Sequence, residues 1–152
     1  MTQEQKDLLL KDLCARLPYG VKVQVDLQSD TYPPITCKVC SIEYAEPGSA
    51  FIGVETSPDT YNEFREFLCK PYLFPLSSMT EELWDKEFRR YGITEFTRDS
   101  FKYGCETLEL YNGNPYLSNI HGFINTLIKN HFDVYGLIPM GLANDATGKD
   151  IY

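Results

Sequence analysis

Two cysteines in the stretch TCKVC, Cys37 and Cys40, have the spacing that zinc knuckles and thiol redox sites share. The residues around them alternate as in a strand, and side chains three positions apart in a strand point to opposite faces. Lys38 and Val39, which separate them, supply no glycine for a knuckle. We therefore expect two separate thiols here, with neither a shared metal ion nor a disulfide between them.

Other metal and cofactor patterns are missing from the sequence. His121 and His131 are too far apart to form a close ligand pair, and no second Cys or His pair accompanies them. The glycines are dispersed, so no phosphate-cradling loop is predicted, and GxSxG, HExxH and calcium-loop patterns are absent. We expect no metal and no cofactor. The cysteines form an odd, scattered set that is typical of reduced thiols: Cys14, Cys37, Cys40, Cys69 and Cys105.

The two histidines have structural explanations that compete with a catalytic one. His121 shares a predicted helix side with Leu117 and Ile124, which favours a partly buried ring bonded to the backbone. His131 follows the helix end, where the helix dipole would favour a protonated imidazole. The alternative is a small hydrolase or transferase with a cysteine or carboxylate nucleophile and His121 as its base. The sequence leans away from an enzyme, and we assign no catalytic residue.

Acidic pairs are frequent in this chain and carry little information about chemistry. Glu81 with Glu82, and Glu106 with Glu109, are predicted to lie on solvated faces or at helix starts.

The segment PYLFPLSSM places apolar side chains between and after Pro71 and Pro75. Such a proline-stiffened stretch either packs across a core or contacts a partner. We favour packing, because single chains rarely expose so much contiguous apolar surface. If the segment instead contacts a partner protein, the binding residues are Tyr72, Phe74 and Leu76.

Composition indicates a globular chain. Residues 1–152 are 43% hydrophobic with a net charge of −8, and this length suits a single domain with one core. The negative charge argues against nucleic acid or an anionic membrane as partner. No secretory signal and no run of apolar residues long enough for a membrane span is present, so we expect a cytoplasmic protein.

The first half predicts one helix and three strands. Thr2 and Gln5 form a capping box for a helix over residues 3–16. Residues 21–28, 35–44 and 50–55 alternate as strands, with a bulge near Cys40 and Ser41 where the alternation changes phase. Short links between them favour a three-stranded antiparallel meander, curled into a small half-barrel that the first helix closes.

The second half predicts mainly helices, which makes the fold class α+β. A helix is expected over residues 57–68, an extended connector over 69–78, and a helix from the cap Thr80 to about residue 91 with Met79 packed over Trp84. A short strand over 107–111 and a helix from Asn114 and Pro115 to about residue 130 follow. The tail should pack as far as Leu142 and fray at its end.

Three stretches, LLLKDLCARLPYGVKV, KPYLFPLSSMTEE and HFDVYGLIPMGLA, resemble a family of short uncharacterised proteins from Bacteroidales gut bacteria and their phages and mobile elements. In place of the Tyr-Arg pair of that family's tail motif this chain has Val134 and Tyr135. The resemblance implies no catalytic residue or cofactor. It implies a small accessory factor, and we expect a non-enzymatic protein that binds an unidentified protein partner.

Overall fold

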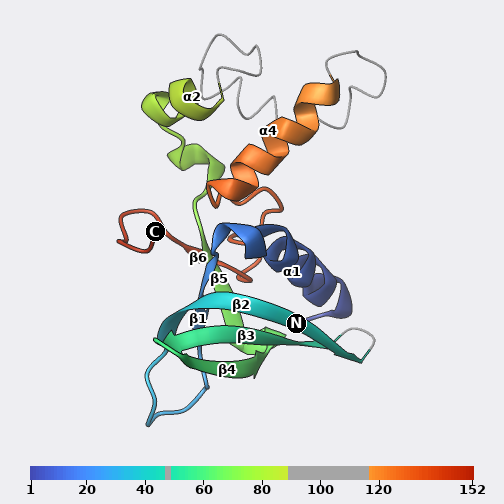
Figure 1. The fold of residues 1–152 in the computed structure, drawn as a ribbon, viewed down its shortest axis with the longest axis vertical. Coiled ribbons are helices and arrows are strands. Elements are labelled where there is room, and N and C mark those ends of the chain that lie inside the picture. The colour runs from blue at the N-terminus through green and yellow to red at the C-terminus, as the bar shows by residue number, and fades with distance from the viewer. Residues whose placement is uncertain (47–48, 89–116) are drawn as a thin grey trace.

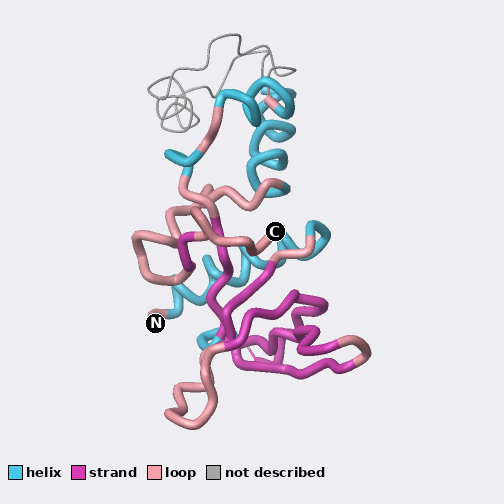
Figure 2. Tube along the Cα trace, turned by 90° about the vertical axis from the view of Figure 1, so that its left-hand side faces the viewer, coloured by secondary structure: helices cyan, strands magenta, loops and turns pink. Residues whose placement is uncertain are grey.

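The computed structural model describes residues 1–46, 49–88 and 117–152. The molecule is elongated, with strands β1 to β4 at one end and helices α2 and α4 at the other (Figure 1). Helix α1, Gln3–Arg16, lies between these two parts. A view turned by 90° shows the same separation of strands from upper helices (Figure 2). None of the helices in the described ranges is long and apolar enough to cross a bilayer.

Helix α1 begins at the predicted capping box and ends at the predicted residue. The Thr2 hydroxyl accepts a hydrogen bond from the Gln5 N–H at 3.3 Å, and the Gln5 side chain accepts from the Thr2 N–H at 2.9 Å. These reciprocal bonds satisfy two N–H groups that the first turn leaves unpaired. Leu9, Leu10 and Leu13 are buried on the side of the helix that packs on the sheet.

Replacing the cap residue, Thr2→Ala, should lower the free energy of unfolding by about 1 kcal/mol, because the Gln5 N–H loses its acceptor. Urea unfolding measures this change. The matched control is Thr31→Ala, the same substitution in an exposed loop, which should leave the midpoint within error. Equal effects of the two variants would contradict the assigned cap.

The sheet has six strands in the order β4-β3-β2-β1-β5-β6. All neighbouring strands pair antiparallel except β5 and β6, which are parallel. The strands are β1 Lys22–Val25, β2 Ile35–Glu46, β3 Ser49–Ser57, β4 Thr60–Arg65, β5 Cys69–Leu73 and β6 Asn144–Asp145. The predicted antiparallel pairing of residues 21–28 with 35–44 is confirmed, but the prediction of a three-stranded sheet is wrong.

The predicted bulge is present in β2. Val39 pairs with Val54 and Ser41 pairs with Gly53, so Cys40 has no partner residue in β3. The extra residue changes which side chains face the core, which explains the shift of phase in the sequence. Cys37 and Val39 are buried before the bulge, whereas Cys40 is exposed.

The predicted helix over residues 57–68 is wrong, because β4 and the 3-10 turn η2, Glu66–Leu68, occupy this segment. The Asn62 amide donates to the Thr56 hydroxyl at 2.8 Å across the β3–β4 hairpin, and Asp59 takes a positive φ of 66° in its turn. Pairing with β3 satisfies backbone groups that β3 would otherwise expose at a sheet edge. Phe64 then packs against the core beside Ile52.

The predicted extended connector over residues 69–78 begins as the strand β5, which pairs with β1 on one side and β6 on the other. Pro71 lies opposite Val23 of β1. A proline is tolerated here because β6 pairs with Tyr72 and Leu73, and among the described residues no strand pairs with Pro71 on that side. The 3-10 turn η3, Leu76–Ser78, completes the connector.

The expectation of a mainly helical second half is wrong for the described residues. Helix α2 spans Glu81–Glu87 and ends earlier than predicted. Its predicted cap is confirmed, because the Thr80 hydroxyl accepts a hydrogen bond from the Leu83 N–H at 3.2 Å. Helix α4 spans Leu117–Lys129, and loops, turns and β6 follow it. The predicted strand over 107–111 and the predicted cap at Asn114 and Pro115 lie outside the described residues.

Two clusters of buried apolar side chains lie along the molecule. The larger lies between α1 and the inner face of the sheet and includes Leu13, Val23 and Ile52. The smaller lies between α2 and α4, and its members are Met79, Trp84, Phe88, Phe123, Leu127 and Phe132. Met79 and Trp84 lie together in it, as the predicted contact requires. Strand β5 leads from one cluster to the other.

A buried arginine joins α1 to the end of α4. The Arg16 guanidinium donates two hydrogen bonds to the Asp12 carboxylate, at 2.8 and 2.7 Å. It also donates to the backbone carbonyls of Ile128, at 3.1 Å, and Phe132, at 2.7 Å. Both charged side chains are fully buried. The guanidinium therefore pairs a buried charge and satisfies carbonyl groups at the end of α4.

The tail returns along the sheet and does not fray in this structure. The apolar part packs as predicted, with Leu137 and Leu142 buried. Beyond it, the Ala146 N–H donates to the Leu73 carbonyl at 2.8 Å, and the Tyr152 hydroxyl donates to the Tyr72 carbonyl at 2.7 Å. The C-terminal residues thereby cover β5.

Candidate functional site

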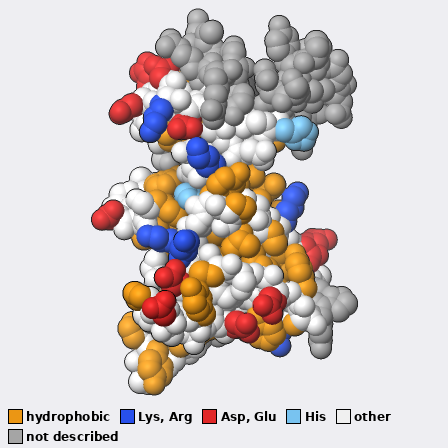
Figure 3. Space-filling model, viewed as in Figure 1, with side chains coloured by type: hydrophobic (Ala, Val, Ile, Leu, Met, Phe, Trp, Pro, Cys, Tyr) orange, Lys and Arg blue, Asp and Glu red, His pale blue; other side chains and the backbone are white. Residues whose placement is uncertain are grey.

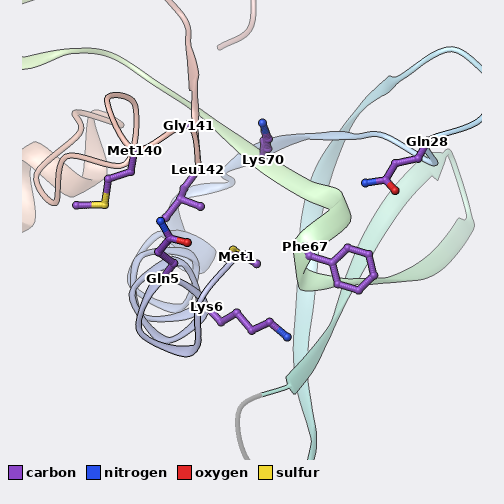
Figure 4. Close-up of a pocket in the computed structure, with 9 residues that line it drawn as sticks. All are labelled: Met1, Gln5, Lys6, Gln28, Phe67, Lys70, Met140, Gly141 and Leu142. Carbon is purple, nitrogen blue, oxygen red and sulfur yellow. The ribbon is translucent and has the colours of Figure 1, made fainter.

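A groove of about 530 Å³ lies where the start of the chain, strand β5 and the loop after α4 meet. Met1 occupies the middle of the close-up in Figure 4, with side chains from several segments around it. The lining residues are Met1, Gln5, Lys6, Gln28, Phe67, Lys70, Met140, Gly141 and Leu142. We call this hollow the Lys6 groove.

Lys6 is held in place by a buried acid. Its ammonium lies 3.0 Å from the Glu66 carboxylate, and Glu66 is almost completely buried. Burial raises the pKa of Glu66, but hydrogen bonds from Lys6 and from backbone N–H groups outweigh burial, so the pKa lies below its usual value. An ammonium has three donors, so Lys6 keeps donors for a ligand while Glu66 fixes its position.

The groove combines cations with exposed apolar side chains. Phe67 is 48% exposed and Met140 is 49% exposed, and both border it. Lys70 adds a second ammonium, and no acidic residue is among the lining side chains. This composition contrasts with the chain as a whole, whose net charge is −8. The groove can therefore hold an apolar group next to an anionic one.

Apolar surface also occurs elsewhere on the molecule. On the face shown in Figure 3, hydrophobic side chains gather across the middle, over α1 and the chain after α4, and acidic side chains border them below. Tyr44 and Tyr61 are exposed on the sheet. Scattered exposed apolar residues are ordinary on a folded protein. The Lys6 groove differs because its exposed apolar side chains surround a hollow that also contains two cations.

A second pocket, of about 300 Å³, lies between η3, α2 and the end of α4. Aromatic rings form much of its wall: the Phe74 ring is 6.2 Å from Phe132 and 6.0 Å from Tyr152, centroid to centroid. The lining residues are Phe74, Ser78, Leu83, Lys129, Asn130, His131, Phe132 and Tyr152. We call it the His131 pocket.

His131 is buried and neutral, so the predicted protonated imidazole is wrong. The residue is 7% exposed, and its ring stacks on Tyr152 at 3.8 Å between centroids. Burial, and next the nearby charge of Arg16, lower the pKa of His131 to about 4. A hydrogen bond to the Tyr19 backbone raises the pKa, but by less. The dipole at the end of α4 does not overcome this loss of hydration.

The residues predicted to contact a partner lie mostly inside the protein. Tyr72 is 6% exposed and belongs to β5, and Phe74 and Leu76 are half-buried. The favoured prediction, that this segment packs across a core, is what the structure shows. Phe74 borders the His131 pocket, and none of the three residues lines the Lys6 groove.

The structure does not join His121 to a nucleophile within the described residues. His121 is exposed on α4, in contrast to the partial burial expected, and it lines neither pocket. Two candidate thiols are buried: burial raises the pKa of Cys37, and burial with smaller charge effects raises the pKa of Cys69 to about 12. These two thiols stay protonated at neutral pH, which makes them poor nucleophiles. Cys105, Glu106 and Glu109 lie outside the described residues.

The TCKVC cysteines are separated by the bulge, with Cys37 in the core and Cys40 exposed. In the parts of the chain that the structure describes, no three His, Cys, Asp or Glu residues form a group suited to a metal ion. Both thiols are free.

Chelation should therefore leave the melting temperature unchanged, since binding energy of a structural zinc would otherwise be folding energy. Elemental analysis of the purified protein accompanies the melting curve. One equivalent of zinc per chain, or a melting temperature that falls with chelator, would show that Cys37 and Cys40 form a knuckle after all.

Sequence reasoning missed the Lys6 groove. Its lining residues come from four separate segments of the chain, and no local pattern connects Lys6 with Phe67 or Met140. The helix predicted over residues 57–68 hid this signal, because it placed Phe67 on a buried apolar side, whereas the structure has Phe67 exposed in the turn η2 after β4.

Comparison of the chain with protein-family models, with curated proteins and with solved structures found no match.

Proposed function

We propose that the protein is a non-enzymatic accessory factor of the cytoplasm that binds a segment of a partner protein in the Lys6 groove. The segment carries an apolar side chain with a carboxylate beside it. The observation that supports this proposal is the joining of two lysines and two half-exposed apolar side chains, Phe67 and Met140, in one groove of an acidic protein.

The openness of the groove favours a protein segment over an enclosed small molecule. Pockets for small molecules bury most of the ligand surface. Here Phe67, Lys70, Met140 and Gln28 are all exposed, so a ligand in the groove keeps one side in solvent. A peptide segment has such a side, where it continues into its own protein. Methionine side chains adapt to different apolar partners, which suits Met140 to this role.

The positions of the charges favour an acidic segment. Glu66 already neutralises Lys6, so Lys6 contributes hydrogen-bond donors at a fixed position and Lys70 contributes the positive charge that attracts a carboxylate. Lys70 is exposed and gains by pairing with a second carboxylate. Elsewhere the excess of acidic residues repels an anionic segment, which directs it to this groove.

Titration calorimetry with a pair of short acetylated peptides tests the proposal. In the first peptide leucine and phenylalanine alternate with glutamate, and in the second glutamine replaces each glutamate. The first should bind about tenfold more tightly at low salt, and the difference should shrink as salt rises. Lys70→Gln and Phe67→Ser should each weaken the acidic peptide about threefold or more, because they remove a charge and an apolar contact.

The matched controls are Lys86→Gln on α2 and Tyr61→Ser on β4, which make the same kinds of change at exposed positions outside the groove. They should leave the affinity unchanged. If Tyr61→Ser weakens binding and Phe67→Ser does not, the partner binds the solvent face of the sheet and the groove is the wrong site. Equal affinity for the two peptides would contradict the role of the lysines.

A further inference from the structure

We propose that the His131 pocket is a second, separate binding site, which takes a small, uncharged, planar aromatic compound carrying an O–H or N–H donor. This proposal does not depend on the Lys6 groove, because the two hollows share no lining residue.

The shape and lining of the pocket suit an aromatic ring. The volume of about 300 Å³ is at the small end for ligand sites, which fits a compound of one or two rings. The Phe74 ring lies 6.2 Å from the Phe132 ring and 6.0 Å from the Tyr152 ring, centroid to centroid, and is tilted by 51° and 50° against them. Aromatic rings prefer tilted and offset contacts at such distances. Leu83 adds an aliphatic side chain to the wall.

The backbone at His131 has a conformation that glycine usually supplies. His131 has a φ of 59°, and it follows the last residues of α4. The His131 N–H donates to the Ile128 carbonyl at 3.0 Å and the Phe132 N–H donates to the Leu127 carbonyl at 3.0 Å. This is the Schellman arrangement of a helix end, in which glycine is the usual residue at the left-handed position. A histidine there is strained, and such strain often accompanies functional sites.

The imidazole has an unused hydrogen-bonding atom. Nδ1 of His131 has no hydrogen-bond partner and exposes less than 1 Å² to solvent. An imidazole nitrogen without a proton accepts a hydrogen bond, so a ligand O–H or N–H could pair with it. Buried polar atoms are rarely left unpaired, which makes this atom the feature that selects a donor on the ligand.

The proposal requires one wall of the pocket to move. Because Nδ1 is covered in the free protein, a ligand donor reaches it only after a neighbouring side chain shifts. Tyr152 stacks on the imidazole and is 43% exposed, whereas Phe132 is 2% exposed. The side chain that must shift is therefore Tyr152, and its movement breaks the hydrogen bonds of its hydroxyl to the Tyr72 carbonyl and the Lys22 N–H.

The charges at the rim favour an uncharged ligand. Lys129 lies 4.0 Å from the Glu87 carboxylate, so the cation and the anion largely cancel. The Ser78 hydroxyl and the Asn130 amide already donate to backbone carbonyls, at 2.7 and 2.8 Å. A charged ligand would therefore lose its hydration without gaining a side chain of opposite charge.

Phenol and anisole, which differ in the donor hydrogen, are the probes. Nitrogen-15 NMR of the imidazole side chains follows both, in the full chain at pH 7.5. Phenol should bind with a dissociation constant of about 1 mM and move the Nδ1 resonance of His131. Anisole should bind about tenfold more weakly and leave that resonance in place. His121 should not respond to either probe, and Phe67→Ser should not alter phenol binding.

The variants His131→Phe and His121→Phe complete the design. His131→Phe keeps an aromatic ring but removes the acceptor, so phenol should lose its advantage over anisole, whereas His121→Phe should retain it. If His131→Phe fails to fold, the comparison of the two probes on the unaltered chain still decides. Equal affinities for phenol and anisole, a response of His121 alone, or no binding of phenol at about 10 mM would each overturn the proposal.

Discussion

Replacing the buried arginine, Arg16→Met, should lower the free energy of unfolding by about 3–5 kcal/mol. The methionine fills much of the space, but it leaves the Asp12 carboxylate buried without a cation. It also removes two donors from the carbonyls of Ile128 and Phe132, which close the end of α4. Urea unfolding, with the unchanged chain in parallel, measures the loss.

A double variant separates the two causes. Asp12→Leu with Arg16→Met removes both charges, so it should be more stable than Arg16→Met alone. It should still be less stable than the unchanged chain, because the Phe132 carbonyl loses its Arg16 donor, whereas the Ile128 carbonyl keeps the His131 N–H. Lys129→Met is the control, since its ion pair with Glu87 is long and exposed; it should cost less than about 1 kcal/mol. A double variant no more stable than the single one would show that the Asp12 charge does not matter.

Stability should fall as the pH is lowered from 7.5 to 5, and His131 should account for about 2 kcal/mol of the change. Above pH 6.5 the ring is neutral in both states. Below it the unfolded chain takes up a proton, whereas the folded chain does not, because burial holds the pKa of His131 at about 4. The free energy of unfolding therefore decreases as the pH falls, until the pH reaches the folded-state pKa of about 4.

The variant His131→Asn isolates this contribution, because asparagine tolerates a positive φ and does not titrate. Its free energy of unfolding, measured in urea at several pH values, should depend less on pH than that of the unchanged chain, by about 2 kcal/mol across this range. His121→Gln is the control for removing a histidine and should retain the full dependence. Parallel curves for His131→Asn and the unchanged chain would contradict the neutral, buried ring.

The sequence predicted what local chemistry determines. The capping box of Thr2 and Gln5 fixes the start of α1, and strict alternation from Val21 to Val25 fixes β1. The change of phase near Cys40 also predicted the bulge that the structure contains. In each case a pattern a few residues long suffices, because the hydrogen bonds and faces involved are local.

Contacts between distant segments explain the errors. The segment with Tyr61 and Phe64 carries an apolar spacing that suits a helix, but the open edge of β3 gives a strand more hydrogen bonds. Strand β5 similarly depends on β1 and on the distant β6. The position of His131 at a helix end predicts a charged ring. The sequence does not reveal that Tyr152, which is not a local neighbour, stacks on that ring.

The candidate site was the least predictable part. Lys6, Phe67 and Met140 are each ordinary surface residues in the sequence, and they become a groove only when α1, η2 and the loop after α4 meet. The segment that did attract attention, with Tyr72, Phe74 and Leu76, is apolar because it packs inside the protein. Clustered apolar residues in a sequence more often report a core than a binding surface.

The measurement that tests the proposed function most directly is chemical-shift mapping of the backbone amides with the acidic, apolar peptide. Binding in the Lys6 groove should perturb the amides of Lys6, Phe67, Lys70 and Leu142, and Lys70→Gln should reduce these changes at the same peptide concentration. Perturbations confined to β4, around Tyr61, would contradict the groove as the binding site, as would a peptide that leaves all of these amides in place.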